Sequence, residues 1–484
     1  MKFSSRSFLH TILIAGVALT LAGCEVGPDY QPPETKIPAD WASDETHVLS
    51  PKGETDQEWW KNFNDPILTQ LIEKASANNF DLKIAEARIA QARATVSTAD
   101  AALLPSGDLK GSATREANQF ALADASASPF ANLLHKPFNV FQTGFDASWE
   151  IDLFGGNQRA AEVASAQLQS SEASRDDVRV SLLAEVARTY VSIRSLETQT
   201  QIANTVIAAD QKTLDIAQQR FNAGEAPRLD VTQAEATIER AQSQLPDLRN
   251  QIAQQEYSMD VLLGEQPGAT RLIIGSSVGP IPASNKAFVL TAPAATIAQR
   301  PDIRVAERKL AAATAQQGVA VAQFFPKISL TGFFGALNTS VNNLVTPGNQ
   351  SWVAGGSVIW PILSYGTLSA NLDASNAQQQ EAMATYQKSM ISALSDVEKS
   401  LTAYNEQQKF LQSAANEVEK DKRARTIAQE RYQAGLTSLL EVLDADRTLF
   451  AAQDRLAQAN ADLTQDLIAL YKSLGGGWTQ EARS

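Results

Sequence analysis

The sequence predicts a mainly α-helical fold with a β-barrel part, built from one helix–hairpin–helix unit that occurs twice in tandem. Three observations predict it. The two halves of the 484-residue chain share residues at constant offsets, long stretches are rich in helix formers, and the segments between them alternate apolar and polar side chains. We expect the helices to pack as a long coiled-coil α-barrel. The strands, four in each chain, are expected to complete a membrane barrel with other copies.

The composition excludes several classes of protein. The chain carries 54 Asp+Glu against 41 Lys+Arg, a formal net charge of −13, whereas binding to nucleic acid requires clustered cations. One cysteine excludes a disulfide framework and cysteine-based metal sites, and three histidines leave little for a histidine metal centre. We therefore predict no nucleic-acid partner, no metal site and no cofactor.

Residues 1–23 are typical of an export signal. Lys2 and Arg6 precede an apolar run that is too short for a membrane anchor. The run ends in Leu21-Ala22-Gly23-Cys24, which resembles a bacterial lipobox. This predicts that Cys24 is the mature N-terminus and carries diacylglycerol and an acyl chain, a firm anchor because it has several chains. The alternative is ordinary signal cleavage beside an incidental cysteine.

A tandem duplication divides the mature chain. Residues 85–111 match 306–332 at an offset of 221, and residues 220–224 match 431–435 at an offset of 211. The ten-residue difference falls within the hairpin, so the first copy has the longer hairpin loop. We place the first repeat at 80–263 and the second at 293–474.

Each repeat is expected to contain a helix, two strands, a long helix, a sharp turn and a further helix. The helices are predicted at about 80–104, 156–222, 228–263, 293–324, 367–433 and 438–474, from their composition and apolar spacing. Pro246 is expected to bend or interrupt its helix. A helix of roughly 67 residues is about 100 Å long, so these helices must pack side by side as a coiled coil.

The segment 139–153 predicts a membrane strand. Phe141, Phe145 and Trp149 fall on one face, while Gln142 and Asp146 fall on the other. A strand of a soluble sandwich would alternate in the same way, but the length favours a spanning strand. Partner strands are predicted at about 107–118, 326–337 and 351–363. Since four strands cannot close a barrel and open edges are not tolerated in lipid, more than one chain is required.

Several short motifs occur in order along this duplicated chain. They are Cys24-Glu25-Val26-Gly27-Pro28-Asp29-Tyr30, Trp59-Trp60, Arg300-Pro301-Asp302-Ile303 with Ala306-Glu307, and two Arg-aromatic-x-Ala-Gly turns. Together they resemble the TolC-like outer-membrane factors of the lipid-anchored type that serves multidrug efflux pumps. The resemblance covers essentially the whole mature chain.

This resemblance implies a homotrimer whose twelve strands form one barrel in outer-membrane lipid and whose helices form a periplasmic α-barrel with a closed tip. An equatorial belt would be built from the N-terminal tether 24–79, the connector 264–292 and the tail 475–484. The implied partners are a periplasmic adaptor protein and an energised inner-membrane transporter.

The closed tip is expected where the long helices turn, at Gly224 and Gly435. Ser438 and Glu441 form a capping-box pattern. Pro227 can occupy the first helical position after the other turn, with Asp230 in the first turn. We interpret Asp230 and Glu441 first as helix caps, and second as acids of the tip.

Leu440, Asp444 and Arg447 are spaced i, i+4, i+7 and lie on one helix stripe. The resemblance implies that this stripe lines the lumen of the closed tip as a periplasmic gate. Three Leu440 side chains would form an apolar plug and three Asp444 a ring that selects cations, while Arg447 would pair with a neighbouring acid. An ordinary solvated face is the alternative. The aligned positions of the first repeat are Gln233 and Ala236, so the charged stripe is not duplicated.

Arg431 and Tyr432 resemble family residues that tie neighbouring helices together in the closed state, a helix-tip lock. Buried helix packing is the alternative role for Tyr432.

Catalysis is not supported by the sequence. Gly275-Ser276-Ser277-Val278-Gly279 matches G-x-S-x-G, but His47 and His135, the two histidines beyond the export signal, precede it. The predicted function is a passive exit duct of the outer membrane for drugs or other small molecules. A non-conducting coiled-coil lipoprotein that tethers envelope layers is the alternative, and the alternating strand 139–153 argues against it.

Overall fold

The computed structural model describes residues 25–34, 36–42, 57–116, 137–275, 277–284 and 292–478. The predicted export signal 1–23, the predicted acylation site Cys24, and parts of the predicted connector and tail lie outside these described residues.

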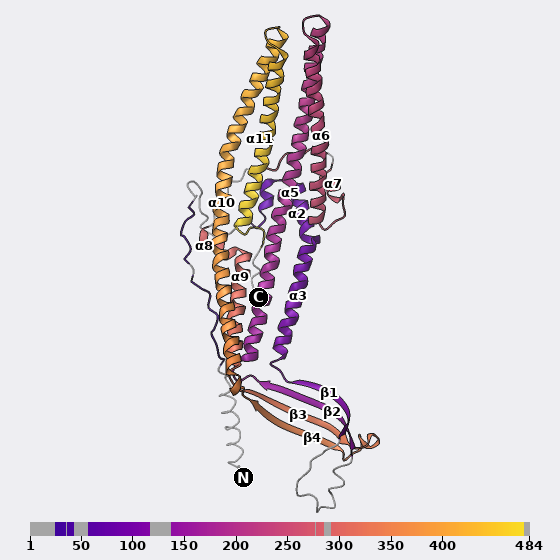
Figure 1. Ribbon diagram of the computed structural model, residues 1–484, viewed down its shortest axis with the longest axis vertical. Helices are drawn as coiled ribbons and strands as arrows, with labels where there is room; N and C mark the ends of the chain where they lie inside the picture. The colour runs from indigo at the N-terminus through magenta and orange to yellow at the C-terminus, as the bar shows by residue number, and fades with distance from the viewer. Residues whose placement is uncertain are drawn as a thin grey trace, which may run out of the picture. The chain divides into compact units, whose positions relative to one another are not determined.

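Long helices make up most of the described chain (Figure 1). The helices of the described chain, long and short, are η1 (Trp59–Phe63), α2 (Pro66–Asn78), α3 (Phe80–Ala101), α5 (Gly156–Asn222), α6 (Arg228–Leu262), α7 (Ala269–Ile274), α8 (Pro293–Gln299), α9 (Pro301–Ala322), α10 (Tyr365–Gln433) and α11 (Leu439–Ser473). Short 3-10 turns lie at Val341–Asn343 and Ile362–Ser364. Helices α5 and α10 contain 67 and 69 residues. None of the described helices combines the length and apolarity that a membrane-spanning helix requires.

The single helix predicted at 293–324 is wrong, because the structure has two helices there. Helix α8 ends at Gln299, Arg300 is extended at φ −72° and ψ 125°, and α9 begins at Pro301. The proline ring disfavours helical backbone at the residue before it, so Arg300 leaves the helix.

The interruption expected at Pro246 does not occur either, since α6 continues through it. A proline removes one backbone hydrogen bond, and the rest of the 35-residue ladder is retained on both sides.

Four antiparallel strands form one sheet in the order β1-β2-β3-β4 (Figure 1). The strands are β1 (Ser106–Glu116), β2 (Phe138–Ile151), β3 (Lys327–Asn338) and β4 (Gln350–Ile359). The first hairpin comes from the first repeat and the second hairpin from the second repeat, so the two copies of the unit meet along β2 and β3. The predicted fold class, a duplicated helix–hairpin–helix chain with four strands, is confirmed.

A row of exposed apolar side chains crosses all four strands. Leu109 pairs with Phe145, Phe145 with Phe334, and Phe334 with Trp352. Their exposed fractions are 70, 63, 60 and 73%. A continuous exposed row of large apolar side chains is typical of a surface that faces lipid or another protein.

The chain forms two compact units, and each draws on both repeats. The first contains the described parts of Met1–Pro33, Ile89–Ser170 and Ala306–Thr385, and therefore the four-stranded sheet. The second contains the described parts of Glu34–Arg88, Ser171–Val305 and Tyr386–Ser484, and therefore the two turns between long helices.

The largest buried cluster lies in the second unit and contains the Trp59-Trp60 motif. The Trp59 ring stacks on Tyr471 with the ring centroids 5.4 Å apart. Tyr190, a member of the same cluster, donates a hydrogen bond of 2.9 Å to Asp65, the N-cap of α2, and Arg194 Nε donates to the Tyr190 hydroxyl at 3.0 Å. The tryptophan motif therefore serves core packing.

Candidate functional site

The two tip turns of the second unit have the same backbone structure. Gly224 and Gly435 adopt φ values of +76° and +75°, which favour glycine. In the first turn the Glu225 N–H donates to Arg220 O, and in the second the Leu436 N–H donates to Arg431 O, both at 2.9 Å. This six-residue closure is a Schellman motif. It explains why both repeats carry glycine at the end of the Arg-aromatic-x-Ala-Gly motif.

The helices after the turns begin differently from the prediction. Ser438 is the N-cap of α11, but its side chain makes no capping hydrogen bond, so the predicted capping box with Glu441 does not form. Pro227 is the N-cap of α6 in extended conformation, and the first helical position is Arg228. Asp230 and Glu441 do lie in the first turns, where a carboxylate is favoured by the helix dipole.

Tyr432 joins the two repeats at the tip. It is 2% exposed and packs against Val231, Leu439 and Val442. Its hydroxyl donates a hydrogen bond of 3.3 Å to Asp230 Oδ2. Burial raises the pKa of the Tyr432 hydroxyl, and the nearby Asp230 carboxylate raises it further. Asp230 thus does more than cap its helix.

The arginine that holds Tyr432 is Arg220, which the sequence did not single out. Its guanidinium lies 4.7 Å from the centroid of the Tyr432 ring and donates to the Tyr432 carbonyl oxygen. Arg431 is exposed, and no ion pair to it is found among the described residues. The 211-residue offset equates Arg220 with Arg431, so the duplication itself was the signal that could have identified Arg220.

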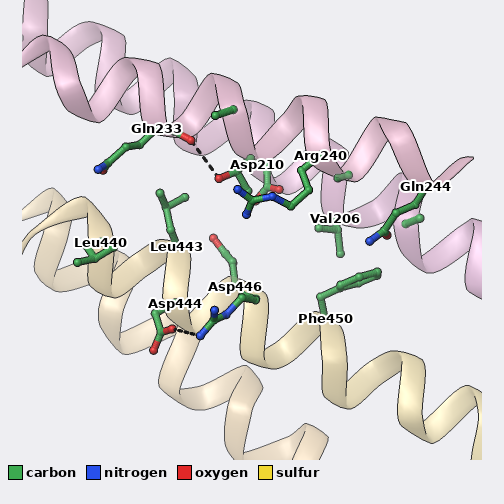
Figure 2. A pocket seen from close by; sticks show the side chains of 15 residues that line it. Val206, Asp210, Gln233, Arg240, Gln244, Leu440, Leu443, Asp444, Asp446 and Phe450 are labelled. Atoms are coloured by element: carbon green, nitrogen blue, oxygen red, sulfur yellow. Dashed lines mark hydrogen bonds and ion pairs between the residues drawn. The ribbon is translucent and has the colours of Figure 1, made fainter.

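A cavity of about 360 Å³ lies just beyond the turns, between α11 on one side and α5 and α6 on the other (Figure 2). Leu440, Asp444 and Arg447 all line it, so the structure brings the predicted gate residues to one surface. Arg447 Nη2 and Asp444 Oδ1 form an ion pair of 2.8 Å within the helix, and both side chains are exposed. The acid that pairs with Arg447 is therefore Asp444, a member of the same predicted stripe.

The first repeat contributes the opposite wall of the same cavity. Gln233 and Ala236, the counterparts of Asp444 and Arg447, line it together with Arg240 (Figure 2). Both walls therefore carry charged side chains, but only the second repeat places them at the positions of Asp444 and Arg447.

Two buried carboxyl groups on this cavity were missed by sequence reasoning. Asp210 of α5 is 2% exposed and Asp446 of α11 is 8% exposed. Arg425 Nε donates to Asp446 Oδ1 at 2.7 Å, while Asp446 Oδ2 and Asp210 Oδ1 have no hydrogen-bond partner among the described residues. Burial and, to a smaller extent, the Asp446 carboxylate raise the pKa of Asp210 to about 6, against the opposing effect of the Arg425 guanidinium. Acids on a long helix are usually solvated, so no sequence signal distinguished these two.

Comparison with known proteins gives consistent matches along the chain. The family model described as Outer membrane efflux protein matches residues 71–265 and 292–476. The chain is 34% identical over 430 residues to the pyoverdine export outer membrane protein OpmQ of Pseudomonas aeruginosa, covering 88% of each chain. It is 31% identical to the solvent efflux pump outer membrane protein SrpC of Pseudomonas putida, covering 99% of each. Among solved structures, the outer-membrane channel OprN is similar with a TM-score of 0.87 and 31% identity, over 94% of this chain and 100% of that chain.

Proposed function

This chain belongs to the outer membrane efflux protein family, and on that premise we propose that three copies form a passive exit duct with a periplasmic gate. The protein resides in the outer membrane, with its helices in the periplasm. Drugs or other small molecules cross the duct after an inner-membrane transporter has energised their transport, and a periplasmic adaptor protein joins the two. The matched relatives are named as export and efflux proteins, and we propose no catalytic activity.

The observation that carries this proposal is the four-stranded sheet with its exposed apolar row. Strands β1 and β4 are both edges of the sheet within one chain, and an unpaired edge costs several kcal/mol for each backbone group in lipid. Pairing β4 of one copy with β1 of the next removes every edge. A coiled-coil tether needs neither the row Leu109–Phe145–Phe334–Trp352 nor a closed sheet.

The gate is proposed at Leu440, Asp444 and Arg447. Their shared cavity and their exposure within one chain support this assignment. Around a threefold axis, three Leu440 side chains would close the passage and three Asp444 carboxylates would attract cations. The Asp444–Arg447 ion pair moderates the charge of that ring.

The helix-tip lock is proposed to have two halves, one within the chain and one between copies. Within the chain, Arg220 packs on Tyr432. The duplication equates these residues with Arg431 and Phe221, and alternating repeats around a trimer would present the exposed Arg431 to Phe221 of the neighbouring copy. Glu441, the counterpart of Asp230, would have no hydroxyl to bind there, because phenylalanine has none.

Cys24 is proposed to be acylated, which would add a lipid anchor to each copy. The preceding Leu21-Ala22-Gly23, which resembles a bacterial lipobox, supports this assignment.

The membrane sheet is tested by placing a charge on either face of β2. Phe145→Arg puts the cation on the apolar row, where a lipid-facing arginine costs about 2–4 kcal/mol near the midplane. Ser148→Arg is the matched control, because it puts the same charge on the opposite face. We expect Phe145→Arg to lose membrane-inserted trimer, measured by native mass spectrometry of the outer-membrane fraction, and Ser148→Arg to retain it. Equal insertion of both variants would contradict a lipid-facing row.

A further inference from the structure

The segment Glu25–Tyr30, here named the strap, lies against the first compact unit without forming a helix or strand. The Val26 N–H donates to Phe154 O at 3.3 Å, and Arg159 Nε donates to Val26 O at 3.3 Å. The strap therefore follows the connection between β2, which ends at Ile151, and α5, which begins at Gly156.

Arg159 is the centre of the docking site. Its side chain is 3% exposed, and its nitrogen atoms lie 3.1 Å from Glu25, 2.7 Å from Asp29 and 2.8 Å from Glu162. A buried guanidinium is tolerated only when it is paired and hydrogen-bonded. Two of the three carboxylates that pair with Arg159 belong to the strap.

Two glycines allow the strap backbone to approach the helices closely. Gly27 has a φ of +95°, and a Cβ atom added to it would lie 2.5 Å from Gly318 Cα on α9. Gly155 has a φ of +74°, and a Cβ atom there would lie 2.8 Å from Glu25 Cγ. Side chains at either position would push the strap away.

Tyr30 ends the strap between the two repeats. Its hydroxyl donates to Glu307, and the Arg308 guanidinium lies 5.5 Å from the centroid of its ring. The ring packs with Ala166 of α5 and Ala311 of α9. The strap thus contacts α5 of the first repeat and α9 of the second.

The duplication shows that these docking residues are not needed for the helical unit itself. By the 211- and 221-residue offsets, Arg159 corresponds to Ala370, Gly318 to Ser97 and Arg308 to Ala87. The same helices form in both repeats, yet only the side that contacts the strap carries the arginines and the close-contact glycine. Their presence is explained by the strap.

We propose that Arg159 is a positioning residue that docks the strap and so holds the acylated Cys24 beside the junction of β2 and α5. This rests on the proposed acylation of Cys24, one residue before Glu25. A docked strap fixes the acyl chains at the level where the strands end. They then set the depth of the barrel in the bilayer, which acyl chains on a loose tether cannot do.

The test is the mobility and depth of a spin label on the strap of the full acylated protein. Pro28 is exposed, and Pro28→Cys supplies the labelling site because an acylated Cys24 does not react. We expect an immobilised spectrum at one depth, measured by power saturation with oxygen and a water-soluble nickel chelate.

Arg159→Ala is expected to lose the immobilised component and the defined depth. Gly27→Ala should do the same without changing any charge, and Arg159→Lys should keep part of the immobilisation.

Arg175→Ala is the matched control, because Arg175 lies on the same helix and pairs with the adjacent Asp176. An unchanged spectrum in both Arg159→Ala and Gly27→Ala would overturn the docking. Mass spectrometry that finds no acyl chains on Cys24 would overturn the anchoring role. Trimer mass and conductance, measured on the same samples, report separately on the proposed duct.

Discussion

Tyr432 of the second repeat donates its hydroxyl to Asp230 of the first, with 3.3 Å between Oη and Oδ2. The two residues are 202 positions apart in the chain, and their contact ties the last turn of α10 to the first turn of α6. One aromatic ring therefore links both pairs of long helices at the tip, with Arg220 on its face.

Tyr432→Phe removes this hydrogen bond and keeps the ring under Arg220. A hydrogen bond of this kind contributes about 1 kcal/mol, so we expect the open probability of single channels in planar bilayers to rise by about fivefold. Tyr432→Ala should raise it further, because the ring contact with Arg220 is lost as well. Tyr257→Phe, on an exposed tyrosine of α6, is the control. Equal open probability in Tyr432→Phe and wild type would show that the hydroxyl does not hold the tip closed.

Two double-cysteine variants distinguish the two halves of the lock. We expect Arg220→Cys with Tyr432→Cys to crosslink within one chain, because these residues touch there. Phe221→Cys with Arg431→Cys should instead give covalent trimers, since every contact between these two positions would join two neighbouring copies. The measurement is the band pattern after treatment with a bifunctional methanethiosulfonate. If the protein is a native trimer and Phe221→Cys with Arg431→Cys gives no intermolecular product, the lock between copies is refuted. The proposal of a trimer would still stand.

The buried Asp210 predicts a pH dependence of tip packing. Its pKa is raised from 3.8 to about 6 by burial and by the Asp446 carboxylate, with Arg425 opposing, and Arg240 and Arg447 line the same cavity. Because the folded state holds the proton more tightly, packing is stabilised at low pH and this contribution is lost as the pH rises from about 4 to about 6. The difference corresponds to about 3 kcal/mol.

Asp210→Asn should abolish that pH dependence and slow local opening at pH 7.5. The measurement is hydrogen exchange of the α5 backbone near residue 210 across this pH range. Asp215→Asn, on an exposed acid of the same helix, should keep the wild-type profile. A pH profile that survives Asp210→Asn would mean that another group titrates.

The repeat and the long helices could be predicted from the sequence because both have a recognisable sequence pattern. The repeat is marked by matching residues at fixed offsets, and the helices by long stretches of helix formers with regular apolar spacing. The sequence placed the long helix of the first repeat at 156–222, where α5 lies. Phe145 was assigned to the apolar face of its strand, and it is 63% exposed in the row across the sheet. The turn motif also led to Tyr432, because its glycine and arginine recur at a fixed offset.

Contacts between distant positions could not be predicted. Arg220 and Arg431 are equivalent in sequence, and only the packing of one helix pair against the other decides which of them meets Tyr432. Asp210 resembles any solvated acid until a neighbouring helix covers it. The ion pair between Glu25 and Arg159 joins residues more than a hundred positions apart, and no periodicity in the chain connects them.

The gated duct is tested most directly by the single-channel conductance of the purified protein in planar bilayers, with Asp444→Ala beside the wild type. We predict small, cation-selective currents that grow and lose selectivity in Asp444→Ala, and a similar growth in Leu440→Gly. Asp462→Ala, on the same helix with its carboxylate bound to Gln458, should behave as wild type. Unchanged conductance and selectivity in both gate variants would contradict the gate, and the absence of current from inserted wild-type protein would contradict the duct.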